Sequence, residues 1–203
     1  MKPAALVLAA ALLASAALAA TAPAPAPRRV SSLVNEPGYQ PLVDPESSSV
    51  ALGRRSDAPL ASMPLRGGAR GLDALGRAVC GAIHAGNRDS LLSLCVTDQE
   101  FRTILWREFP QSRPATGIQW EDAWRILYAR MHAGSFQAVR DYGGHWYEFV
   151  RFESDSVQVF RNFRLHSGLV MVVKDDAGGI QRWRWLRAVV ERRGAFKVYS
   201  TND

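Results

Sequence analysis

The stretch AWRILYARMHAGSFQAVRDYGGHWYEFVRFE, residues 123–153, decides the fold, because the spacing of its apolar residues changes from helical to strand-like. Before the Gly143-Gly144 pair, apolar side chains recur every three or four residues, which predicts a long helix. This helix is expected to begin after Thr116 or Gly117 and to end near Asp141. Its apolar stripe comprises Trp120, Trp124, Leu127, Tyr128 and Met131. The two glycines break the helix, and strands are expected after them.

The residues after this break favour antiparallel strands, because they are rich in aromatic and β-branched side chains. The strand candidates are residues 145–153, 157–165, 169–174, 180–191 and 195–200. Residues 175–179 and 192–194 contain glycine and are the expected hairpin connections. We expect one curved antiparallel sheet with the order of a meander.

Three shorter helices are expected before the long one. The first runs from Gly71 to Gly86, the second follows Asn87, and the third follows a capping box at Thr97–Glu100 and ends before Pro110. Helices that precede a curved antiparallel sheet in about 130 residues predict a single α+β domain over residues 71–203.

The first seventy residues predict export followed by a linker. Residues 1–20 combine Lys2 with a short run rich in Ala and Leu, which is typical of a signal peptide cleaved after Ala19 or Ala20. Residues 21–70 hold most of the prolines and no sustained apolar periodicity, so we expect a disordered linker there. The mature protein is expected to be periplasmic or extracellular, without a membrane span after cleavage.

The charge pattern gives no indication of a nucleic-acid partner. Lys and Arg number 25 against 19 Asp and Glu, a formal net charge of +6, and the basic excess is not concentrated in one block of sequence. Nucleic-acid-binding domains usually carry a clustered basic face. The four histidines, which lack the spacing of metal ligands, are His84, His132, His145 and His166. Neither a metal nor another cofactor is expected.

Three parts of the chain resemble the nuclear transport factor 2-like superfamily. They are residues 85–94, the long Trp-bearing helix, and residues 189–199, which are similar to the closing hairpin of many members. The resemblance implies a cone, in which a strongly curved sheet wraps around the long helix and leaves a pocket at the open end. In some members this pocket supports isomerase, hydratase or hydrolase chemistry, and in others it binds ligands. No catalytic residue can be carried over to this chain.

The candidate site residues fall into two groups. His145 and Tyr147 share one strand face, and Arg161 on the following strand would complete a small acid–base or anion site. Alternatively, His145 is a strand-start residue near solvent. Trp124 and Tyr128 of the long helix are further candidates for lining the cone.

A second row of candidates follows from residues 182–187, in which basic and aromatic side chains alternate from Arg182 to Trp185. On one strand this pattern places Trp183 and Trp185 on one face and Arg182 and Arg184 on the other. Either the tryptophans cover the long helix as part of the core, or one row lines a ligand cavity.

The two cysteines, Cys80 and Cys95, lie at equal distances in sequence from the expected helix turn at Asn87 and Arg88. Two antiparallel helices would bring them to the same height, which predicts a disulfide in an oxidising compartment. Such a bond would close a loop of about 15 residues and contribute roughly 3 kcal/mol to stability.

Three functional hypotheses remain open at this point. The first is an exported module that binds a small apolar or anionic ligand, or a protein partner, at the mouth of the cone. The second is an isomerase- or hydrolase-type enzyme that uses His145, Tyr147 or Tyr128 for acid–base chemistry. The third is a homodimer formed through the outer face of the sheet, with Arg182 and Arg184 at the interface.

Overall fold

A computed structural model describes residues 58–202, except for the side chain of Ala115. The signal peptide predicted at residues 1–20 and the linker residues 21–57 lie outside the described residues. The described residues belong to a single structural unit.

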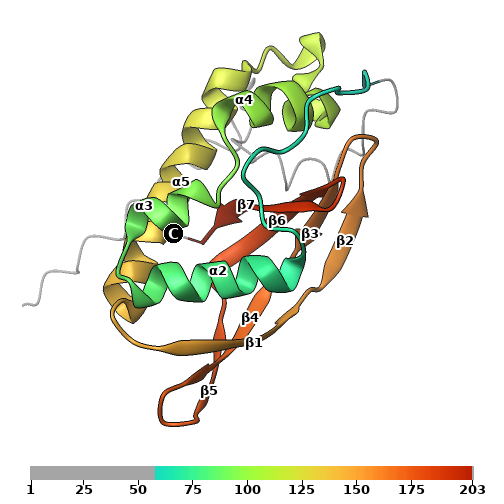
Figure 1. Cartoon of the computed structure of the whole chain (residues 1–203). Coiled ribbons are helices and arrows are strands. Elements are labelled where there is room, and N and C mark those ends of the chain that lie inside the picture. The colour runs from blue at the N-terminus through green and yellow to red at the C-terminus, as the bar shows by residue number, and fades with distance from the viewer. Residues whose placement is uncertain (1–57, 203) are drawn as a thin grey trace, which may run out of the picture. The chain divides into compact units, whose positions relative to one another are not determined.

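The helices precede the strands in the chain, as the apolar periodicity predicts (Figure 1). They are α2 (Leu72–His84), α3 (Arg88–Ser93), α4 (Asp98–Glu100) and α5 (Trp120–Tyr142), with a π-helical turn at Phe101–Leu105 and 3₁₀ turns at Trp106–Glu108, Pro110–Ser112 and Pro114–Thr116. The predicted capping box is present, since Thr97 and Glu100 each accept a hydrogen bond from the backbone N–H of the other. No helix within the described residues is apolar over a length that would cross a membrane.

Within residues 58–202, seven strands form two antiparallel sheets, neither of which closes into a barrel. The strands are β1 (Tyr147–Glu153), β2 (Ser156–Val159), β3 (Arg164–Ser167), β4 (Val170–Asp175), β5 (Ile180–Trp183), β6 (Leu186–Arg192) and β7 (Ala195–Thr201). The three-stranded sheet has the order β1-β4-β5, and the four-stranded sheet has the order β2-β3-β6-β7. The α+β class is therefore confirmed.

The predicted meander is wrong in its pairing and in two of its strands. β1 pairs with β4, and β3 pairs with β6, so neither follows the order of the chain. The strands predicted at 157–165 and 180–191 are broken at residues 160–163 and 184–185. At the first break, Phe160 and Phe163 are both buried and stack with their ring centroids 4.4 Å apart. At the second break the chain leaves the three-stranded sheet and enters the four-stranded one.

Residues 58–70 pack on the folded unit, although the sequence predicts a disordered linker over residues 21–70. Three apolar side chains of this segment are buried: Ala58, Ala61 and Leu65. The Asn162 side chain accepts a hydrogen bond from Ala61 N–H at 2.7 Å and donates one to the Pro59 carbonyl at 2.9 Å. Because backbone hydrogen bonds hold the segment, it needs no periodic apolar pattern, and the predicted boundary at residue 70 is too late.

A glycine in α2 allows this helix to lie close to β1. Gly76 is buried, and a Cβ atom built on it would overlap the ring of Phe149. Gly81 of the same helix is exposed, and a Cβ atom there would meet no atom within 4 Å. The two glycines therefore have different roles in one helix.

We expect Gly76→Ala to destabilise the protein by about 1–3 kcal/mol, although alanine favours helix, because the added methyl group overpacks the contact with Phe149. Gly81→Ala is the matched control and should stabilise the protein by up to about 1 kcal/mol. Urea denaturation of both variants measures the difference. Equal effects of the two substitutions would show that the α2–β1 contact is not close.

The segment that connects α3 to α4 is hydrogen-bonded to β7. Val96 N–H donates to the Val198 carbonyl, and Val198 N–H donates to the Leu94 carbonyl, each at 2.9 Å. α5 packs against both α3 and β7. The α3–α4 connection is thereby fixed next to α5.

Candidate functional site

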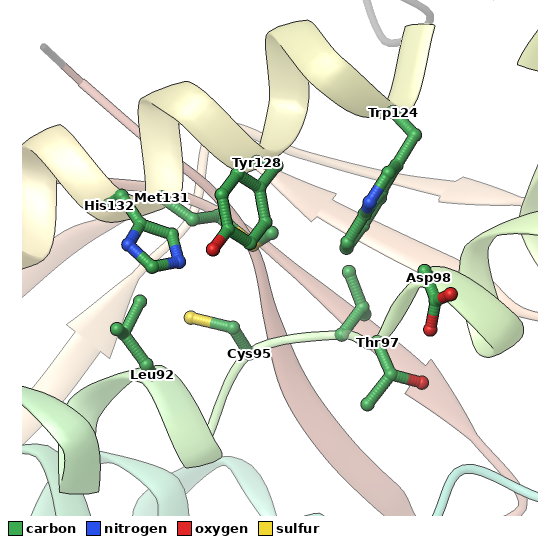
Figure 2. Close-up of a pocket in the computed structure, with 9 residues that line it drawn as sticks. Leu92, Cys95, Thr97, Asp98, Trp124, Tyr128, Met131 and His132 are labelled. Carbon is green, nitrogen blue, oxygen red and sulfur yellow. The ribbon is translucent and has the colours of Figure 1, made fainter. Parts of the chain in front are cut away.

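A pocket of about 400 Å³ lies between α5 and the α3–α4 segment (Figure 2). Small-molecule sites have volumes of roughly 300–1,000 Å³, so this pocket is large enough for a small organic ligand. Its lining residues are Trp124, Tyr128, Met131 and His132 from α5, and Leu92, Cys95, Val96, Thr97 and Asp98 from the α3–α4 segment.

Trp124, Tyr128 and His132 form one wall of the pocket, because residues four positions apart lie on the same face of a helix. The ring centroids of Trp124 and Tyr128 are 5.9 Å apart, and those of Tyr128 and His132 are 4.0 Å apart. The buried ring of Phe101 packs against Trp124 at 5.6 Å. Tyr128 is 48 % exposed, and Trp124 is half-buried. The wall is therefore both supported by the core and open to a ligand.

Cys95 and Met131 supply buried, polarisable sulfur-containing side chains to the same pocket. Burial raises the pKa of the Cys95 thiol to about 12, and the positive charge of Lys197 opposes this only in part. The thiol donates a hydrogen bond to the Leu91 carbonyl, with the sulfur 3.6 Å from the oxygen. Since the thiolate is the nucleophilic form, Cys95 acts here as an apolar surface and not as a nucleophile.

Burial and the contact with Arg88 both favour the neutral form of His132. The Arg88 Nη2 atom lies 2.8 Å from His132 Nδ1. A guanidinium group can only donate, so Nδ1 must accept and the hydrogen of the neutral ring is on Nε2. Burial and the positive charge of Arg88 lower the pKa of His132, and Asp89 opposes them. His132 therefore offers the pocket a neutral ring with one N–H donor.

Thr97 and Asp98 supply polar groups at the opposite end of the pocket from His132, beside Trp124 (Figure 2). Both residues are exposed at the start of α4. The Asp98 carboxylate accepts a hydrogen bond from Gln99 N–H at 2.7 Å. The pocket thus combines an apolar centre with polar groups at both ends, which is the usual composition of a small-molecule site.

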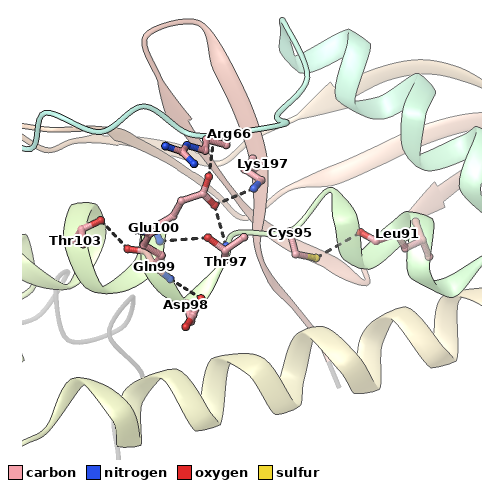
Figure 3. A network of polar contacts seen from close by, with 9 residues as sticks. All are labelled: Arg66, Leu91, Cys95, Thr97, Asp98, Gln99, Glu100, Thr103 and Lys197. Carbon is pink, nitrogen blue, oxygen red and sulfur yellow. Dashed lines mark hydrogen bonds and ion pairs between the residues drawn. The ribbon is translucent and has the colours of Figure 1, made fainter.

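A buried ion pair supports this side of the pocket (Figure 3). The Glu100 carboxylate contacts Lys197 Nζ at 2.8 Å, and both side chains are at most 3 % exposed. Glu100 also accepts hydrogen bonds from Thr97 N–H at 2.9 Å and from Arg66 N–H at 2.6 Å. These bonds join residues 66, 97 and 197, which are far apart in the sequence, and fix the start of α4.

The disulfide predicted between Cys80 and Cys95 is not formed, since both cysteines are free thiols in the structure. The prediction required the second helix to extend past Cys95 in a symmetric pair with the first. Instead, α3 ends at Ser93, and Cys95 lies in an isolated bridge to Val198. Cys95 is therefore aligned with β7 and not with the position of Cys80 on α2.

Of the other predicted site residues, His145, Tyr147 and Trp183 lie near the end of α5 and do not line this pocket. Trp183 is 2 % exposed and stacks on Tyr142 with their ring centroids 4.5 Å apart. Burial, followed by the charge of Asp175, raises the pKa of Tyr147. His145 is exposed, with its ring centroid 6.4 Å from that of Tyr147. The buried rings of this group are part of the core.

Arg161 and Trp185 also lie elsewhere than expected. Arg161 follows β2 in the four-stranded sheet, whereas Tyr147 belongs to the three-stranded sheet, so the two are not on neighbouring strands. The Arg161 guanidinium donates to the Ala58 carbonyl at 2.8 Å. Trp185 lies in the break between β5 and β6, and it therefore does not share a strand face with Trp183.

The sequence predicts Trp124 and Tyr128 as lining residues but not His132, Cys95 or Asp98. The repeat at positions 124, 128 and 132 could have added His132, because it continues the same helix face. No comparable signal exists for Cys95 and Asp98, which reach the pocket only through the pairing of residues 94–96 with β7.

Within residues 58–202, no group of three or more His, Cys, Asp or Glu side chains is arranged to hold a metal ion. Comparisons of the chain with protein-family models, with curated proteins and with solved structures gave no significant match. The function must therefore be inferred from the pocket itself.

Proposed function

We propose that this protein binds a small, flat and largely apolar ligand in the pocket between α5 and the α3–α4 segment. The observation that carries the proposal is the supported aromatic wall of Trp124 and Tyr128, which faces a cavity of about 400 Å³. A flat ligand would stack on these rings and contact Cys95 and Met131. The neutral His132 ring and Thr97 would then orient polar groups at its ends.

Binding is favoured over acid–base catalysis by the state of the polar groups. Of the acid–base candidates from the sequence, His145 and Tyr147 do not line the pocket, whereas Tyr128 does, as part of the aromatic wall. Within the pocket, Nδ1 of His132 is occupied by Arg88, and the Cys95 thiol is neutral. The remaining carboxylate, Asp98, is exposed and accepts a hydrogen bond from Gln99 N–H. A binding site needs only shape and a few orienting groups, which this pocket supplies.

We further propose that the protein is an exported, distant member of the nuclear transport factor 2-like superfamily. The order of helices before antiparallel strands, the long α5 and the closing β6–β7 hairpin support this proposal. The sequence of residues 1–20 supports export. The ligand pocket would then correspond to the open end of the cone that this superfamily implies.

We expect Trp124→Ala to weaken the binding of Nile red, a flat neutral dye, by about tenfold, because the substitution removes the aromatic wall. Dye fluorescence during titration measures the affinity. Trp124 is half-buried, so its loss should leave the fold intact, which circular dichroism checks.

Phe136→Ala is the control for this experiment. Phe136 is an aromatic residue of the same helix, 55 % exposed, and does not line the pocket. This variant should bind the dye like the unmodified protein. Equal affinities of the two variants, or no saturable binding by the unmodified protein, would contradict the proposed function.

A further inference from the structure

The β6–β7 hairpin turn lies between two further pockets. The turn residues Arg193 and Gly194 have φ angles of 51° and 76°, the left-handed values that a two-residue hairpin turn requires. One pocket, of about 240 Å³, lies between this turn and residues 64–70, and the other, of about 300 Å³, lies between the turn and residues 159–164. Both pockets share Arg192, Arg193 and Gly194.

Positive charge gathers in these pockets. Their lining includes five arginines, here called the arginine cluster: Arg70, Arg161, Arg164, Arg192 and Arg193. The 300 Å³ pocket includes one acid, Glu191, which already contacts His166 at 3.0 Å and Arg164 at 3.6 Å. No acidic residue is among the lining residues of the 240 Å³ pocket. This cluster was not visible in the sequence, because its members come from three separate segments.

Arg192 is a buried cation whose hydrogen-bonding capacity is not exhausted. It is 5 % exposed, and its nitrogens donate to the carbonyls of Met63, Asn162 and Ala61. A guanidinium group has five N–H donors, so these three bonds leave two donors without an acceptor among the described residues. All three acceptors are neutral, which leaves the positive charge of the side chain without a directly bonded counter-ion.

Glu108 offsets the charge of Arg192 only in part. Its negative charge acts on Arg192, but among the described residues no ion pair within 4 Å joins the two side chains, and the Glu108 oxygens accept hydrogen bonds from Arg161 N–H and Asn162 N–H, each at 2.5 Å. Burial and the neighbouring charge of Arg193 both lower the pKa of Arg192. An anion in the 240 Å³ pocket would offset the repulsion between the positive charges of Arg192 and Arg193.

The other walls of the 240 Å³ pocket suit an anion as well. A Cβ atom on Gly68 would lie 2.8 Å from the Phe196 carbonyl oxygen, so glycine is needed for this segment to lie against β7. Arg70 follows it and, among residues 58–202, makes no ion pair within 4 Å. Arg193 is exposed and makes one long hydrogen bond, 3.5 Å from the Ser62 carbonyl. Two adaptable guanidinium groups therefore border the pocket beside the buried one.

We propose that the 240 Å³ pocket binds a phosphate group, held by Arg70 and Arg193 and reached by the two remaining donors of Arg192. Guanidinium groups pair with phosphate through two parallel hydrogen bonds, and a phosphate monoester carries close to two negative charges. Three arginines without an acidic lining residue match a dianion better than a single carboxylate. This site is separate from the pocket at α5 and does not rest on the function proposed for it.

The phosphate can belong to a soluble molecule or to a lipid headgroup, and the experiment distinguishes the two. Inorganic phosphate is titrated into the purified full chain by isothermal calorimetry. In parallel, the chain is mixed with vesicles of phosphatidic acid, a lipid that carries a phosphate monoester, and phosphatidylcholine, or of phosphatidylcholine alone, and the bound fraction is measured by sedimentation. Inorganic phosphate bound in solution indicates a soluble ligand, and binding only to the vesicles that contain phosphatidic acid indicates a lipid headgroup.

The test variant is Arg193→Asn, which creates an Asn-Gly pair that suits this turn and keeps the hairpin. The control is Arg125→Ala, which removes the same charge from the exposed face of α5. Arg193→Asn should weaken binding to phosphate or to the anionic vesicles by about tenfold, with Arg125→Ala unchanged. Equal weakening by both variants would show a general charge effect and overturn the proposal. Absence of binding to both probes would overturn it as well.

Discussion

Replacing Glu100 with alanine is expected to lower the free energy of unfolding by about 3–5 kcal/mol, because it leaves Lys197 charged, buried and without its partner. Lys197 is 2 % exposed, so water cannot replace the lost carboxylate without local opening. The substitution also removes the acceptor for Thr97 N–H and Arg66 N–H. Both the start of α4 and the segment before α2 lose an anchor.

Urea denaturation followed by far-ultraviolet circular dichroism measures this loss. Glu148→Ala is the control, since Glu148 is an exposed carboxylate on β1, and its removal should change stability by less than about 0.5 kcal/mol. The loss for Glu100→Gln should fall between those of Glu148→Ala and Glu100→Ala, because the amide oxygen can still accept one of the two backbone hydrogen bonds but the side chain carries no charge. A loss below about 1 kcal/mol for Glu100→Ala would mean that Lys197 reaches solvent and that the pair is not buried.

Replacing Arg192 with alanine is expected to cost about 3 kcal/mol and to release residues 58–65 from the sheet. The buried guanidinium is the common donor to the carbonyls of Ala61, Met63 and Asn162, and its removal leaves these acceptors unpaired. It also removes the positive charge that acts on the buried Glu108. The effect on stability should therefore be concentrated where residues 58–65 contact β6.

Hydrogen exchange detected by mass spectrometry tests this release directly, because it resolves the segment from the rest of the chain. In Arg192→Ala, peptides covering residues 58–65 should exchange much faster, while α5 remains protected. Arg182→Ala is the control, since Arg182 forms an exposed ion pair with Glu153 and its loss should leave the segment unaffected. Unchanged exchange at residues 58–65 would show that Arg192 does not anchor them.

The helices and turns could be predicted from the sequence, because their signals are local. Asn87 and Thr97 were identified as helix starts, and each accepts the expected hydrogen bond from a backbone N–H in the first turn. The hairpin at Arg193-Gly194 was identified from its glycine, and both residues have positive φ angles. These features depend on a few consecutive residues.

The pairing of the strands and the limits of the folded unit could not be predicted in the same way. Phe160 and Phe163 have strong strand propensity, but their stacking in the core interrupts the ladder. Residues 58–65 pack without apolar periodicity, because the side chains of Asn162 and Arg192, a hundred or more positions later, hydrogen-bond to their backbone. Such contacts join distant parts of the chain, and no pattern within one segment records them.

Only part of the candidate site could be predicted, because some of its residues come together through contacts between distant segments. Trp124 and Tyr128 belong to one helical stripe, which the sequence displays. Cys95 and Asp98 complete the pocket only because β7 holds the α3–α4 connection next to α5. Trp183 and Trp185 were expected to share a face, but the break between β5 and β6 separates them.

The central claim, a pocket that holds a small ligand, is tested most directly by native mass spectrometry of the protein purified without added ligand and then mixed with Nile red. The account predicts a complex with one bound molecule, either retained from the cell or gained from the dye, which is lost on denaturation and reduced in Trp124→Ala. A bare protein mass in both samples would contradict the account, because a supported aromatic wall beside an open cavity of about 400 Å³ would then bind nothing.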